Sequence, residues 1–141
     1  LVADSCGAGR WRGGLGMRRS YRVLAKEALM QLRADRMKFP PYGLAGGEPA
    51  RPAENLLGEA DTQTKLPSKI TRWLAEGDLV THVQPGGGGY GDPLEREPER
   101  VAFDVWNEKI TAVFAREHHR VVVDQKTGKL DIPATASLRR Q

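Results

Sequence analysis

The residues with the clearest chemical potential form a glycine run late in the chain. Gly86, Gly88 and Gly91 match the spacing of a phosphate-binding loop, and they follow a predicted strand. That chemistry needs the last glycine to open a helix whose N-terminus faces the phosphate. Here Asp92 and Pro93 follow instead, and an acidic side chain at this point repels phosphate. The sequence therefore argues against a dinucleotide site, and we favour a close-packed glycine loop over a ligand-binding one.

A second candidate is the basic segment at the start of the chain. Residues 1–39 hold nine Lys and Arg against three Asp and Glu, a local charge of +6, whereas the whole chain carries +4. Arg10 and Arg12 flank Trp11, an alternation of base and aromatic that RNA-binding segments also show. Because this pattern occurs once, we favour a solvated or interface-facing loop over a nucleic-acid site. A basic surface of this kind attracts anions, including the acidic surface of a partner protein.

Histidine and cysteine offer little further chemistry. The chain has three histidines (His82, His118 and His119) and one cysteine, Cys6. Adjacent histidines in a helix point about 100° apart, so His118 and His119 do not easily share a metal ion. Cys6 has no histidine near it in sequence to act as a base, and a single cysteine excludes an internal disulfide. We therefore expect no metal site in this chain, and catalytic residues stay unassigned.

Length and composition place the chain in a broad class. It has 141 residues, of which 39% are hydrophobic, and this is enough for one ordinary domain. The longest apolar runs are only a few residues, so we expect no membrane span and no signal-peptide core. A single cysteine fits a reducing compartment, and we expect a cytoplasmic location. The chain starts without Met, which leaves a natural subunit and a fragment of a longer protein both open.

The elements that must position these residues change character near Leu94. Fifteen of 16 glycines and seven of nine prolines precede Leu94. Alternation of apolar and polar residues with period 2 predicts strands over 19–33 and 69–84. We expect each range to form an antiparallel hairpin, the first turning near Lys26-Glu27 and the second at Glu76-Gly77-Asp78.

The remaining third of the chain has the pattern of helices. Apolar residues with helical spacing predict helices near 98–108 and 110–118, and a short terminal helix follows over 134–140. We therefore expect an α+β fold, with antiparallel hairpins and Gly/Pro-rich loops in the N-terminal two thirds and a small helical C-terminal part. The expected division is a β-rich segment over 1–94 and a helical segment over 95–141, packed together as one structural unit.

Seven short motifs, taken in order, resemble the hydantoinase B/oxoprolinase family. They are Asp4 to Gly16 (DSCGAGRWRGGLG), Arg33 to Arg36 (RADR), Phe39 to Gly47 (FPPYGLAGG), Asn55 to Leu57 (NLL), Leu66 to Lys69 (LPSK), Pro85 to Leu94 (PGGGGYGDPL) and Pro98 to Val101 (PERV). Each motif alone is weak, whereas seven in this order at family-like spacing form a specific signal. The resemblance covers nearly the whole chain and corresponds to the C-terminal portion of the family's large subunit. Cys6 and Arg120 stand where the family usually has glycine.

The resemblance implies a place in a multi-subunit enzyme. Hydantoinase B-type subunits pair with hydantoinase A-type subunits that bind ATP, and together they open cyclic amides such as hydantoins and oxoproline. Related complexes carboxylate acetone or acetophenone. The implied partners are a hydantoinase A-like ATP-binding subunit and the upstream part of a hydantoinase B-like subunit. ATP and a divalent metal are expected in the complex, with neither bound by this segment, and a non-catalytic interaction subunit stays open as an alternative.

The candidate residues for a substrate-facing or interface-facing loop are basic, acidic or glycine residues of these motifs. They are Arg10, Arg12, Asp35, Arg36, Gly86, Gly87, Gly88, Gly89 and Asp92. We expect the glycine run and the Arg10–Gly16 segment to approach the same cleft. We also expect Gly88→Val to be damaging and Gly128→Asn to be mild, because only the first lies in the glycine run. Without the upstream part of the subunit, we expect the chain to be neither stable nor active.

Overall fold

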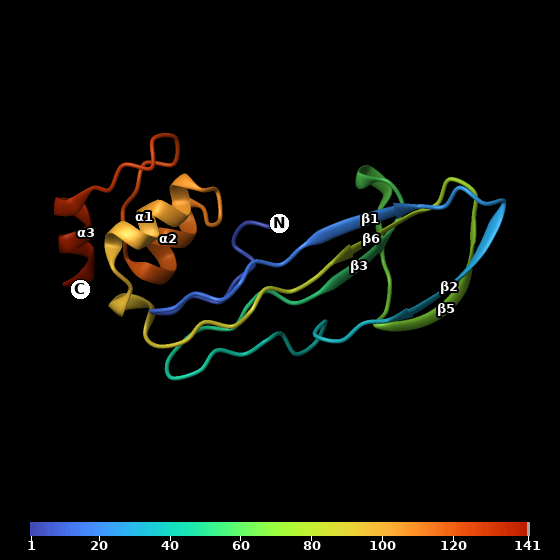
Figure 1. The fold of residues 1–141 in the computed structure, drawn as a ribbon, viewed down its shortest axis with the longest axis horizontal. Helices are drawn as coiled ribbons and strands as arrows, with labels where there is room; N and C mark the ends of the chain where they lie inside the picture. The colour runs from blue at the N-terminus through green and yellow to red at the C-terminus, as the bar shows by residue number, and fades with distance from the viewer. Residues whose placement is uncertain (141) are drawn as a thin grey trace.

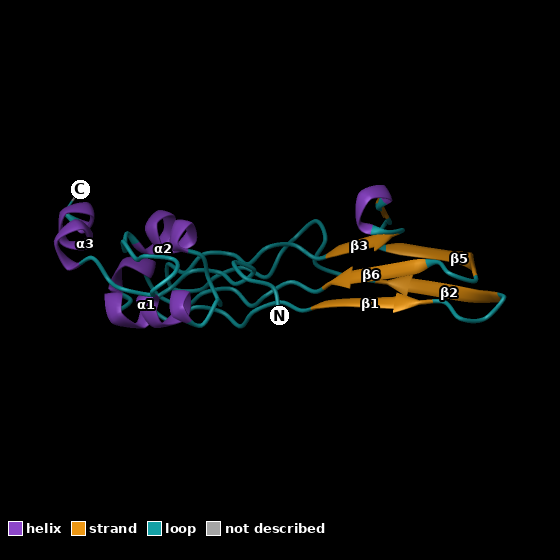
Figure 2. Cartoon of the chain, turned by 90° about the horizontal axis from the view of Figure 1, so that it is seen from above, coloured by secondary structure: helices purple, strands orange, loops and turns teal. Residues whose placement is uncertain are grey.

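A computed structural model describes residues 1–140 of the chain as an elongated molecule with three regions along its length. Strands occupy one end, helices occupy the other end, and extended segments run between them (Figures 1 and 2). The C-terminal residues lie at the helical end, and the N-terminus lies near the middle. The predicted α+β class, with strands first and helices last, is confirmed.

The larger sheet has four strands in the order β1-β6-β3-β4, and each neighbouring pair is antiparallel. Its strands are β1 (Arg18–Arg22), β6 (Leu79–Val83), β3 (Glu54–Leu57) and β4 (Thr64–Lys65). A 3-10 turn, η1 (Ala60–Thr62), connects β3 to β4. Residues directly opposite one another share a face of the sheet. Opposed side chains of β3 and β6 therefore lie next to each other on the same face.

The smaller sheet is a two-stranded ribbon of β2 (Glu27–Arg33) and β5 (Lys69–Ala75). Side chains of β2 alternate between exposed and half-buried along the strand, which is the pattern of a strand with one covered face. Leu74 on β5 is buried on the covered side. Figure 1 shows this ribbon folding back beneath the larger sheet at the strand end of the molecule.

The strand positions are confirmed, but the predicted pairing within two hairpins is wrong. β1 pairs with β6 and β2 pairs with β5, so the ranges 18–33 and 69–83 lie along one another as two long bent strands. At the bend Val23 donates its N–H to Asp78, and Gly77 donates to Val23. Four residues (23–26) oppose three (76–78) there, which is a bulge that bends the pair. Period-2 alternation predicts a strand, but it does not specify which strand is its partner.

Three extended segments form the middle of the molecule, and we call residues 5–16, 41–50 and 84–91 the glycine-packed bundle. They are joined by backbone hydrogen bonds, such as Gly7 N–H to Gly87 O at 2.9 Å and Glu48 N–H to Ala8 O at 2.8 Å. Figure 2 shows them as loops that run side by side between the strands and the helices. The backbone polar groups are thus satisfied between segments without a regular sheet.

Glycine is required in the bundle because the backbones approach too closely for a side chain. A Cβ built on Gly88 would lie 1.9 Å from the carbonyl oxygen of Tyr42, and one on Gly89 would lie 1.8 Å from that of Ala8. Neither glycine has a positive φ, so close approach rather than left-handed backbone imposes the choice. Gly14 is an exception in the bundle, with nothing within 4 Å of the place that a Cβ would take. The predicted close-packed loop is confirmed.

The three predicted helices are present as α1 (Pro98–Trp106), α2 (Ala112–His119) and α3 (Ile132–Arg139), after a 3-10 turn, η2 (Pro93–Glu95). Pro98 occupies the first turn of α1, where its missing N–H is not needed. A small apolar core joins the helices to the start of the chain. Its largest members are Val101, Val105, Ile110, Phe114, Val121 and Val123. None of the described helices is long and apolar enough to cross a membrane.

Two positions near the helices have unusual backbone. Arg120, which stands where the family usually has glycine, ends α2 in the left-handed region with φ 51°. Gly128 has φ +67°, and a Cβ there would lie 2.8 Å from Cβ of Trp106. The expectation that Gly128→Asn is mild is therefore wrong, because the side chain of α1 fills the space beside this turn. Val123 forms an isolated antiparallel bridge with Leu130.

The bundle generates a direct test. Gly88→Ala is expected to lower the free energy of unfolding by about 3 kcal/mol or more, because its Cβ must push the Tyr42 backbone away. Gly14→Ala, in the same bundle but with open space, is expected to change it by less than about 1 kcal/mol. Pulse proteolysis in urea on the assembled protein measures both. Equal small losses would show that the segments are flexible linkers.

Candidate functional site

A buried ion-pair network joins the glycine-packed bundle to α1. Asp104 lies on the buried stripe of α1 between Val101 and Val105 and is only 3% exposed. It accepts two hydrogen bonds from Arg12, from Nε at 2.8 Å and from Nη2 at 3.1 Å. A third comes from Nη2 of Arg96 at 2.7 Å. Two guanidinium groups thus converge on one carboxylate, that of Arg12 from 92 positions away in sequence and that of Arg96 from 8 positions away.

The surroundings keep this carboxylate ionised. Burial by itself raises the pKa of Asp104, but the hydrogen bonds and positive charges of Arg12 and Arg96 outweigh it, so its pKa lies below the usual value. The guanidinium groups are satisfied further by backbone carbonyls: Arg12 donates to Gly13, and Arg96 donates to Arg10. We call this network of Arg12, Arg96 and Asp104 the joint, because it fixes α1 to the bundle. Removing one member leaves charge uncompensated in the interior.

Two further polar contacts hold the helices against the start of the chain and the bundle. Asp4 accepts from the N–H of Thr111 at 2.7 Å and from its hydroxyl at 2.9 Å, just ahead of α2. The carboxylate of Glu48 in the bundle forms a hydrogen bond with Nδ1 of His118 on α2. The centroid of the His118 ring lies 4.2 Å from that of the Phe114 ring. These contacts fix the orientation of the helical region relative to the bundle.

The structure brings most of the sequence-predicted site residues into this one region. Arg12 is used in the buried network, and Arg10 is exposed with a 3.5 Å contact to Glu95. Asp92 accepts from the N–H of Leu94 at the start of η2, and 86–89 lies within the bundle. The glycine run and the Arg10–Gly16 segment do meet, as expected, but they pack against each other and leave no cleft between them.

Asp35 and Arg36 lie apart from this joint, after the end of β2. Both are exposed, and Arg36 has φ 65° while its carbonyl accepts from the N–H of Ala53. Asp35 borders a polar hollow of about 420 Å³, together with His82 on β6. Nδ1 of His82 donates to Oδ1 of the buried Asn55 at 2.6 Å, since an amide oxygen only accepts. Burial and then the charge of Arg19 lower the pKa of His82.

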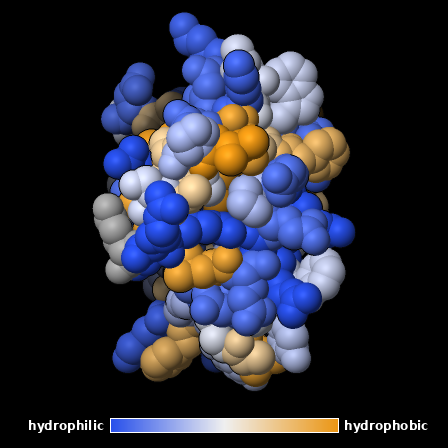
Figure 3. Space-filling model, turned by 90° about the vertical axis from the view of Figure 1, so that its left-hand side faces the viewer, coloured by the Kyte–Doolittle hydropathy of each residue, from blue (hydrophilic) through white to orange (hydrophobic). Residues whose placement is uncertain are grey.

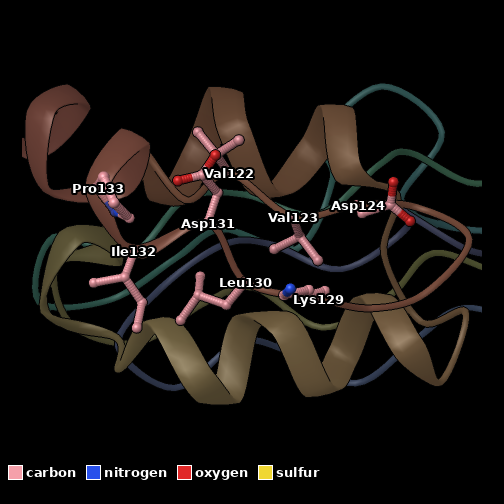
Figure 4. Close-up of a pocket in the computed structure, with 8 residues that line it drawn as sticks. All are labelled: Val122, Val123, Asp124, Lys129, Leu130, Asp131, Ile132 and Pro133. Carbon is pink, nitrogen blue, oxygen red and sulfur yellow. The ribbon is translucent and has the colours of Figure 1, made fainter.

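A hollow of about 610 Å³ lies in the helical region (Figure 4). Its lining includes two carboxylates, but both already serve the local backbone. Asp124 accepts from the N–H groups of Lys126 and Thr127, and Asp131 accepts from that of Ala134. Lys129 and the apolar side chains drawn in Figure 4 form the rest of the hollow, and this mostly apolar lining has the character of a packing surface.

Catalytic chemistry finds little support in the described part of the chain. Cys6 is buried, and burial raises the pKa of its thiol, which disfavours the reactive thiolate. Within residues 1–140, no group of three or more His, Cys, Asp or Glu could hold a metal ion. The donor set therefore does not fit a divalent metal here.

Large apolar side chains are exposed at several places along the molecule. On the glycine-packed bundle, Trp11 and Leu44 are bridged to Tyr90 from either side, and all three are more than half exposed. On the helical region, Phe103 and Trp106 of α1 are also exposed. Figure 3 shows apolar patches among the polar surface at the helical end. Exposed aromatic side chains in such number are typical of surfaces that pack against other protein.

Sequence reasoning missed the central residue of the joint. Asp104 falls on the apolar stripe of the predicted helix, three positions after Val101 and one before Val105. A charged residue at such a position is almost never buried without a partner, so the pattern itself signalled a buried ion pair. Its partners Arg12 and Arg96, and the contact of Glu48 with His118, depend on tertiary structure and carry no local signal.

Comparison with known proteins identifies the family of the chain. The family model for hydantoinase B/oxoprolinase matches residues 1–93, and the chain belongs to that family. The resemblance seen in the motifs is thereby confirmed.

Particular relatives can be named. An uncharacterised protein of Methanocaldococcus jannaschii is 37% identical over 99% of the chain, and caprolactamase subunit beta of Pseudomonas jessenii is 35% identical over 99%. The crystal structure of ATP-dependent caprolactamase from that Pseudomonas superposes with a TM-score of 0.86 at 33% identity, and nucleotide-free acetone carboxylase with 0.76 at 26%. Both structures cover 100% of the chain. The chain spans about a quarter of the length of these relatives.

The joint predicts a specific pH dependence. Asp104→Asn is expected to lower the free energy of unfolding at pH 7 by about 3 kcal/mol or more, because Arg12 and Arg96 lose their counter-charge. Since the folded pKa of Asp104 lies below its unfolded value of about 3.9, the wild-type advantage is complete above that pH. It declines as the pH falls through the folded pKa.

Urea pulse proteolysis between pH 7 and pH 3 measures the difference between the two proteins. Glu97→Gln is the matched control, because Glu97 pairs with Arg100 on the exposed surface of α1 and should contribute less than about 1 kcal/mol. A similar loss in both variants, or a wild-type advantage that does not change with pH, would contradict this role for Asp104.

Proposed function

We propose that this chain forms the C-terminal part, or a small subunit, of an ATP-dependent complex of the hydantoinase and oxoprolinase type that acts on cyclic amides in the cytoplasm. The observation that carries the proposal is the likeness to the caprolactamase subunit. It extends over the whole chain in both sequence and fold, including the helical region beyond the family match. Caprolactam is itself a cyclic amide, which is the substrate class that the motifs imply.

Within such a complex the chain would position other parts rather than carry out bond cleavage. Its joint around Asp104 and its glycine-packed bundle make a stiff element with exposed apolar side chains on several faces. The proposed partners are a hydantoinase A-like subunit that binds ATP and the upstream part of a hydantoinase B-like subunit. ATP and a divalent metal would be held by those partners, because the described residues offer no fitting donor set.

A related ketone carboxylase is the second candidate. The likeness to acetone carboxylase also extends over the whole chain, and it favours an ATP-dependent complex in either case. The lower TM-score and identity place it behind the cyclic amide hydrolase. A subunit used only for interaction would share the same fold, and activity of the assembled complex separates these possibilities.

The test is reconstitution with separately expressed partners from the same genome. We expect hydrolysis of caprolactam, a hydantoin or 5-oxoproline that depends on ATP and requires all components, with no activity from this chain alone. Acetone or acetophenone with bicarbonate should give no product. Gly88→Val in this chain should reduce activity strongly, and Gly14→Ala should not. Carboxylation without amide hydrolysis would favour the second candidate, and full amide hydrolysis without this chain would contradict the proposal.

A further inference from the structure

The outer face of the β2–β5 ribbon carries an exposed apolar pair. Leu29 and Trp73 are directly opposite each other in the register, so their side chains share this face. Leu29 is 51% exposed and Trp73 is 63% exposed. Neither belongs to the covered side of the ribbon, where Leu74 is buried. An exposed Trp beside an exposed Leu is the composition of an interface anchor rather than of a solvated strand.

The same face carries two like charges directly opposite each other. Arg33 at the end of β2 pairs in register with Lys69 at the start of β5. Neither forms an ion pair within the part of the chain that the structure describes. Like charges at opposite positions destabilise an antiparallel pair, so this arrangement has a cost that the chain itself does not offset.

The ribbon has little support of its own on this side. Within residues 1–140 it has only two strands, so both of its outer edges are unpaired there, and an isolated two-stranded ribbon is marginal in water. Arg33 lies four positions after Leu29 along the strand, which corresponds to about 13 Å. We call each pair of opposed residues on this face a rung. Arg33 and Lys69 form a cationic rung, and Leu29 and Trp73 form an apolar rung at a fixed spacing from it, with the neutral pair Gln31 and Thr71 between them.

We propose that this outer face is a docking surface for an acidic protein surface, one that offers carboxylates to Arg33 and Lys69 and an apolar pocket to Trp73. The inference rests on the proposed function in one respect, that the acidic surface belongs to the subunits of the complex. Opposite charges would relieve the repulsion between Arg33 and Lys69, and covering Trp73 would remove the apolar exposure. Arg36, a residue of the same RADR motif, lies just beyond the cationic rung.

Charge distribution favours protein over the other occupants. Nucleic acid requires cations spread along the whole face, whereas here Glu27 stands on the same face at the end opposite Arg33 and repels phosphate. A second copy that docked through this same face would offer only Glu27 to two cations. A protein surface can instead place an acidic group and a pocket at the required spacing.

The experiment measures how tightly this chain is held by the remaining parts of the complex, from the release of the chain when the assembled complex is diluted. The charge variant is Arg33→Glu with Lys69→Glu, which keeps a like-charged rung and so preserves the folding cost. Its matched control, Lys126→Glu with Arg140→Glu, makes the same change in net charge on exposed residues of the helical region. Trp73→Ser removes the anchor, and Tyr21→Ser removes an exposed aromatic of β1 as its control.

We expect the charge variant and Trp73→Ser each to weaken binding at least about tenfold, and the controls to stay within about twofold. Higher salt should weaken the wild type more than the charge variant. In a background with Trp11→Phe and Trp106→Phe, the emission of Trp73 should shift to shorter wavelength on binding.

Unchanged binding by the two ribbon variants, or no binding by the wild type, would overturn the inference. Two other results would also overturn it. One is that the ribbon variants weaken a dimer of this chain but leave the protein complex unchanged. The other is that they weaken a complex with a 20-base-pair DNA duplex at 0.15 M salt but leave the protein complex unchanged. Amide hydrolysis with binding insensitive to the ribbon would reject the docking surface alone. Sensitive binding without amide hydrolysis would reject the proposed substrate class alone.

Discussion

The rest of the molecule depends on the close approach of backbones in the glycine-packed bundle. Carbonyl oxygens of the two neighbouring segments lie less than 2 Å from where a Cβ of Gly88 or Gly89 would be. The strands extend from one end of this bundle, and the helices attach to its other end. Ordering so many glycines costs conformational entropy, and hydrogen bonds between the segments offset that cost. Any side chain at the contact positions separates the segments and displaces both ends.

The buried network around Asp104 transmits this rigidity to the helices. A helix that packs only through small apolar residues can slide along a surface, whereas a bidentate contact with Arg12 fixes its register. Asp4 and Glu48 add two further contacts at α2. The helical region thus has one defined orientation, which suits a part whose proposed role is to hold other parts in place.

The surface has a different character from the interior. In the interior, backbone groups of the bundle pair between segments and the charges of the joint pair with one another, although Nε of Arg96 has no partner among the described residues. On the surface, aromatic side chains are exposed on the bundle, on α1 and on the β2–β5 ribbon. A chain that spans about a quarter of its relatives' length has few residues with which to cover such surfaces. The like charges of Arg33 and Lys69, which face each other on the ribbon, likewise have no ion-pair partner among the described residues.

Sequence alone determined the class, the element types and the family. Period-2 and helical patterns located the strands and helices, because side-chain alternation is a local property of each element. The glycine run indicated close packing, since four consecutive glycines are costly unless something occupies the space where side chains would be. Tertiary structure alone decided that 18–33 pairs with 69–83, that Arg12 belongs to Asp104, and that the glycine segments fill the expected cleft. These contacts join residues far apart in the chain, and their free energy depends on geometry that no local pattern encodes.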